Sequence, residues 1–327
     1  MRAVFLSALL LTTSVLANQE SAQSLYDQAV IPWEQGKKEG WSAMLEAADA
    51  GNVEALCTIA RAYQGTSLIV SEKANQYFER AAKLNGLCGM LALSNLGSGP
   101  ILNSDLGSVK EHTDWRQRVT DIAKSQAEQG DIYAIKTYAF IQGAKGSESG
   151  YCEWMEKAAK LGDADAMSQL ASAIRDGCGW YLIPGSRKKA VYYWTEQAAN
   201  HGNPRAMEKM ARFAYDDGDF KGMLEWFDKA IATGNENSLA MAGSILMGHV
   251  SSLMPLPEQY QDPVKAYALN YILRQYNPDD NDEYSSPYSR FKELDKKLTK
   301  AEKEQAIAWA EEWMKNHQVR TYGLVFN

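Results

Sequence analysis

Apolar residues recur at helical spacing along most of this chain, and small residues and glycines interrupt them at intervals. The segment from Tyr151 to Gly218 shows the full pattern twice. In each copy a helix with aromatic residues ends in Ala-Ala, a glycine follows, and a second helix begins with Ala-Met. Apolar residues at i, i+3 and i+4 predict one buried stripe on each helix. The pattern therefore predicts helix hairpins that turn at Gly162 and Gly202.

Turns of the same kind recur at positions 51, 85, 130, 162, 202 and 234, with Asn85 in place of glycine. Glycine adopts a positive φ at little cost, which suits the point where a helix stops and the chain reverses. Asp163 and Asn203 follow their glycines and can cap the next helix. One hairpin cannot bury its apolar stripe alone, so successive hairpins must stack. The sequence therefore predicts an all-α fold.

Three features together resemble the Sel-1-like repeat (SLR) family, a relative of the tetratricopeptide repeats. They are the Ala-Ala…Gly turn, the Ala-Leu or Ala-Met start of the second helix, and aromatic helices that start with a basic residue and alanine, at Lys73, Lys189 and Lys265. The resemblance covers roughly Gly40 to Tyr276. It implies an α/α superhelical solenoid of about six to seven helix-pair repeats, with capping helices at both ends.

The chain divides into three parts. Residues 1–17 read as a signal peptide, with Arg2, an apolar core and Val-Leu-Ala before Asn18; the alternative is a buried first helix. Residues 18–277 hold the predicted repeats, and residues 278–327 a polar loop and a C-terminal capping helix that opens with the capping box of Thr299 and Glu302. We expect a periplasmic or secreted protein with no integral membrane segment after signal removal.

The charge balance limits the partners. The chain has 34 Lys and Arg against 41 Asp and Glu, a net charge of −7, and removal of Arg2 with the signal peptide leaves 33 against 41, or −8. This acidic balance argues against nucleic acid, and against an anionic membrane as the main partner.

Four cysteines in an exported chain suggest two disulfides. Cys152 opens one helix and Cys178 lies just beyond the helix that returns beside it, so this pair is favoured. Cys57 and Cys88 fall early in equivalent helices of successive repeats and are a plausible second pair. Free thiols in the core are the alternative.

The sequence lacks a phosphate-binding glycine loop, a His-Glu-x-x-His motif and a Cys-x-x-Cys motif. We therefore expect no enzyme activity, no cofactor and no metal site. His201 reads as a solvated turn residue, and the acidic run from Asp216 to Asp219 as a helix end. Ser186 and Lys189 form one Ser-x-x-Lys pattern, without the motifs that accompany it in penicillin-binding proteins.

The residues indicate a binding surface better than they indicate a catalytic site. In the family's frame the first helix of each pair lines the concave side, and a protein or peptide ligand would bind there. The outward positions rich in Arg and Tyr, residue types that dominate interface energies, are Arg61, Tyr133, Lys136, Phe140, Arg175, Arg205, Glu208, Arg212 and Tyr215. The sharper hypothesis centres the groove on Phe140, Arg175, Arg212 and Tyr215. Acidic residues share this stripe, so a solvated groove without a ligand is the alternative.

Two functions follow from the resemblance. The first is a non-enzymatic periplasmic or secreted scaffold for protein–protein interaction, in particular an immunity or regulatory protein that binds a secreted effector such as a type VI phospholipase. The second is a weak penicillin-binding or β-lactamase-like activity, which is associated with cysteine-rich secreted relatives. The loops 97–111, 177–186 and 249–262 are further places where a ligand could bind.

Overall fold

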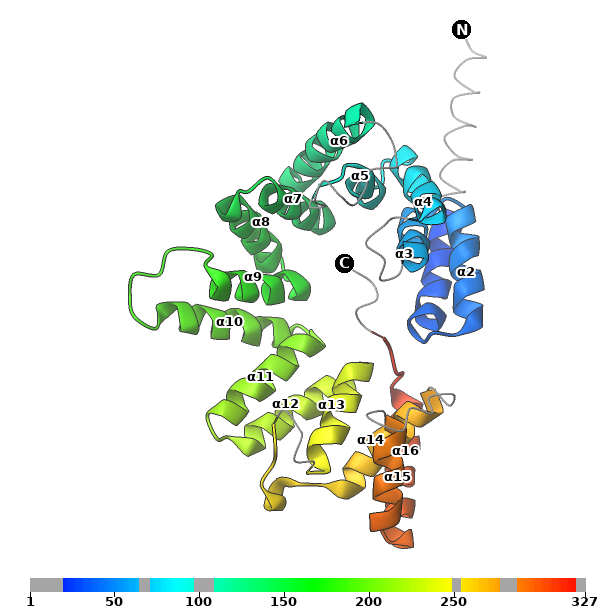
Figure 1. Cartoon of the computed structure of the whole chain (residues 1–327), viewed down its shortest axis with the longest axis vertical. Coiled ribbons are helices and arrows are strands. Elements are labelled where there is room, and N and C mark those ends of the chain that lie inside the picture. The colour runs from blue at the N-terminus through cyan, green and yellow to red at the C-terminus, as the bar shows by residue number, and fades with distance from the viewer. Residues whose placement is uncertain (1–19, 65–70, 97–108, 249–253, 277–286, 322–327) are drawn as a thin grey trace. The chain divides into compact units, whose positions relative to one another are not determined.

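The computed structural model describes residues 20–64, 71–96, 109–248, 254–276 and 287–321 (Figure 1). Across these ranges the regular elements are helices, and one isolated β-bridge joins Asn235 to Arg320. A helix over residues 20–34 comes first. The helices that follow are α2 (Lys38–Asp49), α3 (Val53–Gln64), α4 (Glu72–Lys83), α5 (Leu87–Leu93), α6 (Val109–Glu128), α7 (Ile132–Ala144), α8 (Glu148–Lys160), α9 (Ala164–Asp176), α10 (Ser186–Asn200), α11 (Pro204–Asp216), α12 (Phe220–Ala232), α13 (Glu236–Leu246), the 3-10 helix Glu258–Tyr260, α14 (Pro263–Tyr276), α15 (Pro287–Lys297) and α16 (Lys300–Asn316).

The chain forms two compact units, residues 1–154 with 325–327 and residues 155–324. Within each unit, helices pack against their neighbours in sequence, for example α3 on α4 in the first unit and α11 on α12 in the second. Contacts between successive helix pairs are the signature of a repeat solenoid. The predicted fold class, an all-α stack of helix pairs, is confirmed.

The turns inside the pairs share one geometry. Gly162 has φ +94° and donates its N–H to the carbonyl of Ala159, and Asp163 donates to the carbonyl of Ala158. The same two bonds form at the turns that follow residues 50, 129 and 201. Asn85 takes the glycine position with φ +63°, which asparagine tolerates better than most residues. The turn pattern therefore stops each helix at a fixed point.

A side-chain cap starts the helix after most turns. We call α3, α5, α7, α9, α11 and α13 the post-turn helices. The caps accept an N–H from the third residue of the helix at 2.6–2.9 Å, and they are Asn52, Asp131, Asp163, Asn203 and Asn235. Two caps also donate to the neighbouring repeat, since the amide of Asn203 reaches Asp165 at 2.7 Å and that of Asn52 reaches Gln23 at 3.1 Å. An asparagine cap therefore joins repeats as well as starting a helix.

Small and flexible side chains fill the core. The paired alanines before the turns, such as Ala198 and Ala199, are buried, which lets adjacent helices approach closely. Larger buried side chains fill the space between the pairs, among them Met44, Leu56 and Ile59 in the first unit and Met223, Phe227 and Leu239 in the second. Burial of this apolar surface is the main force that holds successive pairs together.

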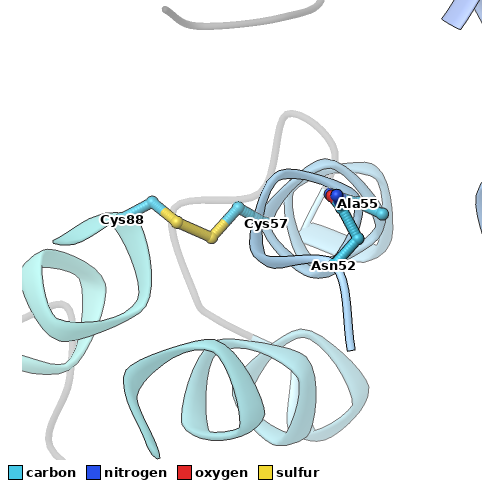
Figure 2. The surroundings of a disulfide bond; sticks show 4 residues. All are labelled: Asn52, Ala55, Cys57 and Cys88. Atoms are coloured by element: carbon cyan, nitrogen blue, oxygen red, sulfur yellow. A yellow bond between two sulfur atoms is a disulfide. The ribbon is translucent and has the colours of Figure 1, made fainter. Parts of the chain in front are cut away.

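A disulfide links two post-turn helices in the first unit. Cys57 of α3 is bonded to Cys88 of α5, with Cα atoms 6.3 Å apart. Figure 2 shows Cys57 close to the start of α3, where Asn52 caps the helix at Ala55. The predicted Cys57–Cys88 pair is confirmed. Cys152 and Cys178 are disulfide-bonded as well, so none of the four cysteines is free.

The helix boundaries differ from the prediction in two places. Helix α6 begins at Val109, inside the segment predicted as a loop over 97–111, of which residues 97–108 lie outside the described residues. Helix α15 was not predicted: the sequence was read as a polar loop followed by a single capping helix. Phe291 of α15 packs against Tyr267 of the preceding helix α14, a contact that the polar pattern of this segment does not reveal.

The end of α16 and the segment after it complete the second unit. The capping box of Thr299 and Glu302 is present as predicted. Beyond the helix, Arg320 donates its N–H to the carbonyl of Gly234, and Glu236 donates to the carbonyl of Arg320. A Cβ at Gly234 would collide with the carbonyl of Gln318. Glycine is therefore needed at this turn both for its φ of +79° and for the close approach of the C-terminal segment.

Replacing Asn203 with Asp should separate its two roles. The carboxylate can still cap α11, but it loses the donor to Asp165 and sets two carboxylates against each other. We expect the free energy of unfolding to fall by about 1–3 kcal/mol at neutral pH, and by less in acid, where a carboxyl proton restores a donor. Urea unfolding followed by circular dichroism measures this. The control is Asp131→Asn, which keeps the cap on α7; equal stabilities for the two variants would contradict the link.

Removing the Cys57–Cys88 disulfide should destabilise the chain through the unfolded state. For a sequence separation of 31 residues, replacing both cysteines with Ser should lower the free energy of unfolding by roughly 3 kcal/mol. A peptide map of the non-reduced protein should show Cys57 joined to Cys88, and it also tests the predicted Cys152–Cys178 pair. Alkylation of any cysteine before reduction would contradict the oxidised state.

Candidate functional site

The nine residues predicted to line a groove all lie on post-turn helices, each of which is the second helix of its hairpin and the first helix of a pair in the family's frame. Arg61 lies on α3, Tyr133, Lys136 and Phe140 on α7, Arg175 on α9, and Arg205, Glu208, Arg212 and Tyr215 on α11. The first four belong to the first compact unit and the other five to the second. Phe140 is thus in a different unit from the other three residues of the predicted centre.

In the first unit, Arg61 and Tyr133 come together from α3 and α7. The guanidinium of Arg61 lies beside the phenol of Tyr133. Burial raises the pKa of Tyr133 above its ordinary value, while the positive charge of Arg61 acts in the opposite direction. Glu54, also on α3, lies close enough to raise this pKa too. The structure thus brings together two of the predicted residues and one of the acids of the same stripe.

Sequence reasoning missed a fourth member of this cluster, Tyr26. Burial raises the pKa of its phenol, and the negative charge of Glu54 raises it further, while Arg61 lowers it. Tyr26 belongs to the leading helix over residues 20–34, whose apolar pattern does not indicate which side faces α3. Tyr133 and Phe140, seven residues apart on one face of α7, are each 43 % exposed. This part of the face therefore offers aromatic surface beside a charged cluster.

In the second unit, three polar contacts tie the post-turn helices α9, α11 and α13 to one another. The Asn203–Asp165 bond is the first. The ammonium of Lys209 on α11 donates to the hydroxyl of Ser172 on α9 at 3.1 Å, and the hydroxyl of Ser238 on α13 donates to the carboxylate of Glu208 at 2.5 Å. These bonds place the three helices side by side.

Lys209 is the residue at the centre of this surface, and it was not predicted. Its side chain is half-buried, and burial lowers the pKa of its ammonium; the nearby guanidinium groups of Arg175 and Arg205 lower it further, while Asp176 raises it. Arg205, Lys209 and Arg212 follow the spacing i, i+4, i+7, which puts them on one face of α11. That spacing is the sequence signal that could have identified Lys209.

Two of the predicted cations have carboxylate partners on their own helices. Arg175 contacts Asp176 at 2.8 Å, and Arg212 contacts Asp216 at 2.9 Å. All four side chains are roughly half or more exposed, so each pair is worth little and can open for a ligand. These two arginines therefore remain candidates for binding.

Two predicted residues are engaged inside the protein rather than directed outward. Glu208 is half-buried and accepts the hydrogen bond from Ser238. Tyr215 is half-buried, its ring packs edge-on against Phe220, and its hydroxyl donates to the carbonyl of Pro255 at 3.4 Å. The helical period placed both on the outer side of α11, but it could not show that α13 and the segment after it cover that side.

The predicted chemical candidates have structural roles. The hydroxyl of Ser186 donates to the carbonyl of Ile183 at 2.6 Å, which uses the serine of the Ser-x-x-Lys pattern in a turn. His201 is exposed in its turn, with Nδ1 beside the carbonyl of Gln197. The run from Asp216 to Asp219 is a helix end, as predicted, and Asp219 caps α12.

Within the described residues no cluster of metal-ligating side chains occurs, and none of the helices has the length and apolar character to cross a bilayer.

Glu208 generates a pH-dependent prediction. Burial raises its pKa above the ordinary value of 4.5, although Ser238 and Arg205 act to lower it. A raised pKa in the folded state favours the protonated form, so this stabilising contribution is present below pH 4.5 and is lost as the pH rises through the folded-state pKa. Glu208→Gln keeps an acceptor for Ser238 and cannot ionise. We expect the stability of the Gln variant, relative to the unmodified chain, to increase over that interval, as measured by urea unfolding at a series of pH values; a difference that does not change with pH would contradict the raised pKa.

Comparison with known proteins finds likeness in structure. No protein-family model matches the chain, and no curated protein matches it. A protective antigen of uropathogenic Escherichia coli with an SLR fold is 18 % identical, with a TM-score of 0.44, and the match covers 92 % of this chain and 62 % of the antigen. A Sel1 repeat protein from Oxalobacter formigenes is 20 % identical, with a TM-score of 0.41, over 95 % of this chain and 92 % of that protein. The chain thus spans less than two thirds of the antigen's length, and its matches to SLR proteins extend over most of its own length.

Proposed function

We propose that this chain is a non-enzymatic repeat scaffold, periplasmic or secreted, that binds another protein through its post-turn helices. The packing of helix pairs supports a role in binding, because a row of similar helices presents side chains from several repeats on one face. The oxidised cysteines support an oxidising compartment outside the cytoplasm.

The observation that carries the proposal is the cationic group on α9 and α11. Lys209 is partly desolvated, it lies near Arg175 and Arg205, and its hydrogen-bond partner is a neutral hydroxyl. Among the described residues, no carboxylate forms an ion pair with Lys209 or with Arg205. A carboxylate from a partner would relieve the repulsion between these cations, and partly buried charge-assisted bonds are among the stronger ones. The partner surface is therefore expected to present acidic side chains.

Within this class we favour a regulatory or immunity protein that binds a secreted effector, such as a type VI phospholipase. The resemblance to exported SLR proteins supports this narrower role; the residues of the face support protein binding in general. Fold alone does not determine function, so the partner itself has to be identified.

The tethered full chain, incubated with the envelope fraction, should retain a partner that mass spectrometry identifies. Replacing Arg205 and Lys209 with Gln should then raise the dissociation constant for that partner about 10–100-fold, because two charge contacts are lost, one of them from the half-buried Lys209. Lys209→Arg, which keeps the charge, should retain most of the affinity.

The matched control is Lys221→Gln on α12, a lysine whose side chain is 84 % exposed. It should leave the dissociation constant unchanged. Equal affinity for the double variant and the unmodified chain would remove the face of α9 and α11 from consideration. Circular dichroism spectra of all variants establish that the fold is retained.

A further inference from the structure

The loop over residues 177–185, between α9 and α10, carries the most exposed apolar side chains of the described residues. It stands away from the ends of the two helices that it joins (Figure 1). Trp180 is 93 % exposed, Leu182 87 % and Ile183 74 %, whereas the next large apolar side chain, Leu161, is 54 % exposed. Single exposed apolar residues are ordinary, but three within four positions are a feature that calls for a partner.

The base of the loop is held firmly. Arg187 donates to the carbonyl of Ile174 and, at 3.1 Å each, to the carbonyls of Cys178 and Gly179. Its guanidinium also lies 4.9 Å from the centre of the Tyr181 ring, which is half-buried. These bonds to three carbonyls fix the start of the loop against the end of α9.

One further contact holds each end of the loop. Cys178 is buried and disulfide-bonded at the start, and the Ser186 hydroxyl bonds to the carbonyl of Ile183 at the end. The loop is therefore a preformed projection, and its apolar residues stay in water unless something covers them.

The loop and the first part of α10 are basic in an acidic chain, although Asp176 directly precedes the loop. Residues 177–195 contain Arg187, Lys188 and Lys189 and no Asp or Glu, although the whole chain has a net charge of −7. Lys188 and Lys189 are exposed at the start of α10, next to the loop. The exposed apolar residues of the loop and the two exposed lysines are thus neighbours along the chain.

We propose that the 177–185 loop is an anchor that inserts into the interface of an anionic phospholipid bilayer. The side chains of Trp180, Leu182 and Ile183 are 93 %, 87 % and 74 % exposed, so most of the surface of each is open to a surrounding apolar medium. Tryptophan prefers the level of the lipid headgroups, and nearby lysines gain energy from anionic lipids. The anchor does not span the membrane; it holds the repeat scaffold at the surface of the bilayer.

The test is sedimentation of the full chain with vesicles. We expect binding to vesicles of equal parts phosphatidylethanolamine and phosphatidylglycerol, and much weaker binding to phosphatidylcholine alone. Replacing Trp180, Leu182 and Ile183 with Ser should lower the partition coefficient by about tenfold or more, since binding scales with inserted apolar area. Replacing Lys188 and Lys189 with Gln should lower it about thirtyfold on the anionic vesicles and leave the weak binding to phosphatidylcholine unchanged.

Two control variants match these changes elsewhere in the same unit. Trp309→Ser alters another exposed tryptophan, which is 40 % exposed on α16. Replacing Lys221 and Lys300 with Gln removes two lysines whose side chains are 84 % and 91 % exposed. Both controls should bind as the unmodified chain does. Because every variant shares the rest of the chain, the differences report on the replaced residues.

Two results would overturn the proposal. One is an unmodified chain that stays in the supernatant with anionic vesicles at low salt. The other is a triple Ser variant that sediments as well as the unmodified chain. A triple Ser variant that loses a protein partner while vesicle binding is absent in all forms would assign the loop to a protein interface instead.

Discussion

The whole structure depends on how each helix pair reverses. A helix pair cannot bury its apolar stripe alone, so the second helix must leave the turn in a direction that lets it meet the next pair. A left-handed residue and the capping side chain after it set that direction, as Gly162 and Asp163 show. Where the cap is asparagine, as at Asn203, its amide also holds the preceding post-turn helix. One local turn therefore determines both the end of a helix and the contact between repeats.

The surface of the post-turn helices follows from the same constraint. Because the caps and the polar contacts hold α9, α11 and α13 side by side, charged residues from different repeats become neighbours. Lys209 loses hydration next to two arginines, and Glu208 loses hydration next to Ser238, so the pKa values of the two side chains move in opposite directions. Glu208 has found its partner within the fold. Lys209 retains an unused capacity for a carboxylate, which is the reason to place binding there.

The sequence predicted what depends on local pattern and missed what depends on distant contacts. The turns, the caps and the Cys57–Cys88 pair follow from spacing along the chain, because equivalent positions in successive repeats become neighbours. The pairing of Arg320 with the turn at Gly234 joins segments far apart in the sequence, and α15 is held by aromatic packing on α14 that its polar pattern does not show. The candidate binding face was likewise predicted only in part. The helical period identified which residues share one face of α11, but it could not show that α13 and the segment after it cover Glu208 and Tyr215.

Insertions between helix pairs are the places where this architecture can add a function without disturbing its packing. The stack needs the faces of α9 and α10 that meet each other, and of the nine residues from 177 to 185 that join them only Cys178 is buried. Water would normally drive such a loop to bury its apolar residues. Here the hydrogen bonds of Arg187 and the disulfide-bonded Cys178 fix the start of the loop, and Trp180, which follows it, is exposed. A loop whose apolar side chains stay exposed to water keeps that surface available for a lipid bilayer, and the adjacent lysines favour a bilayer with negatively charged headgroups.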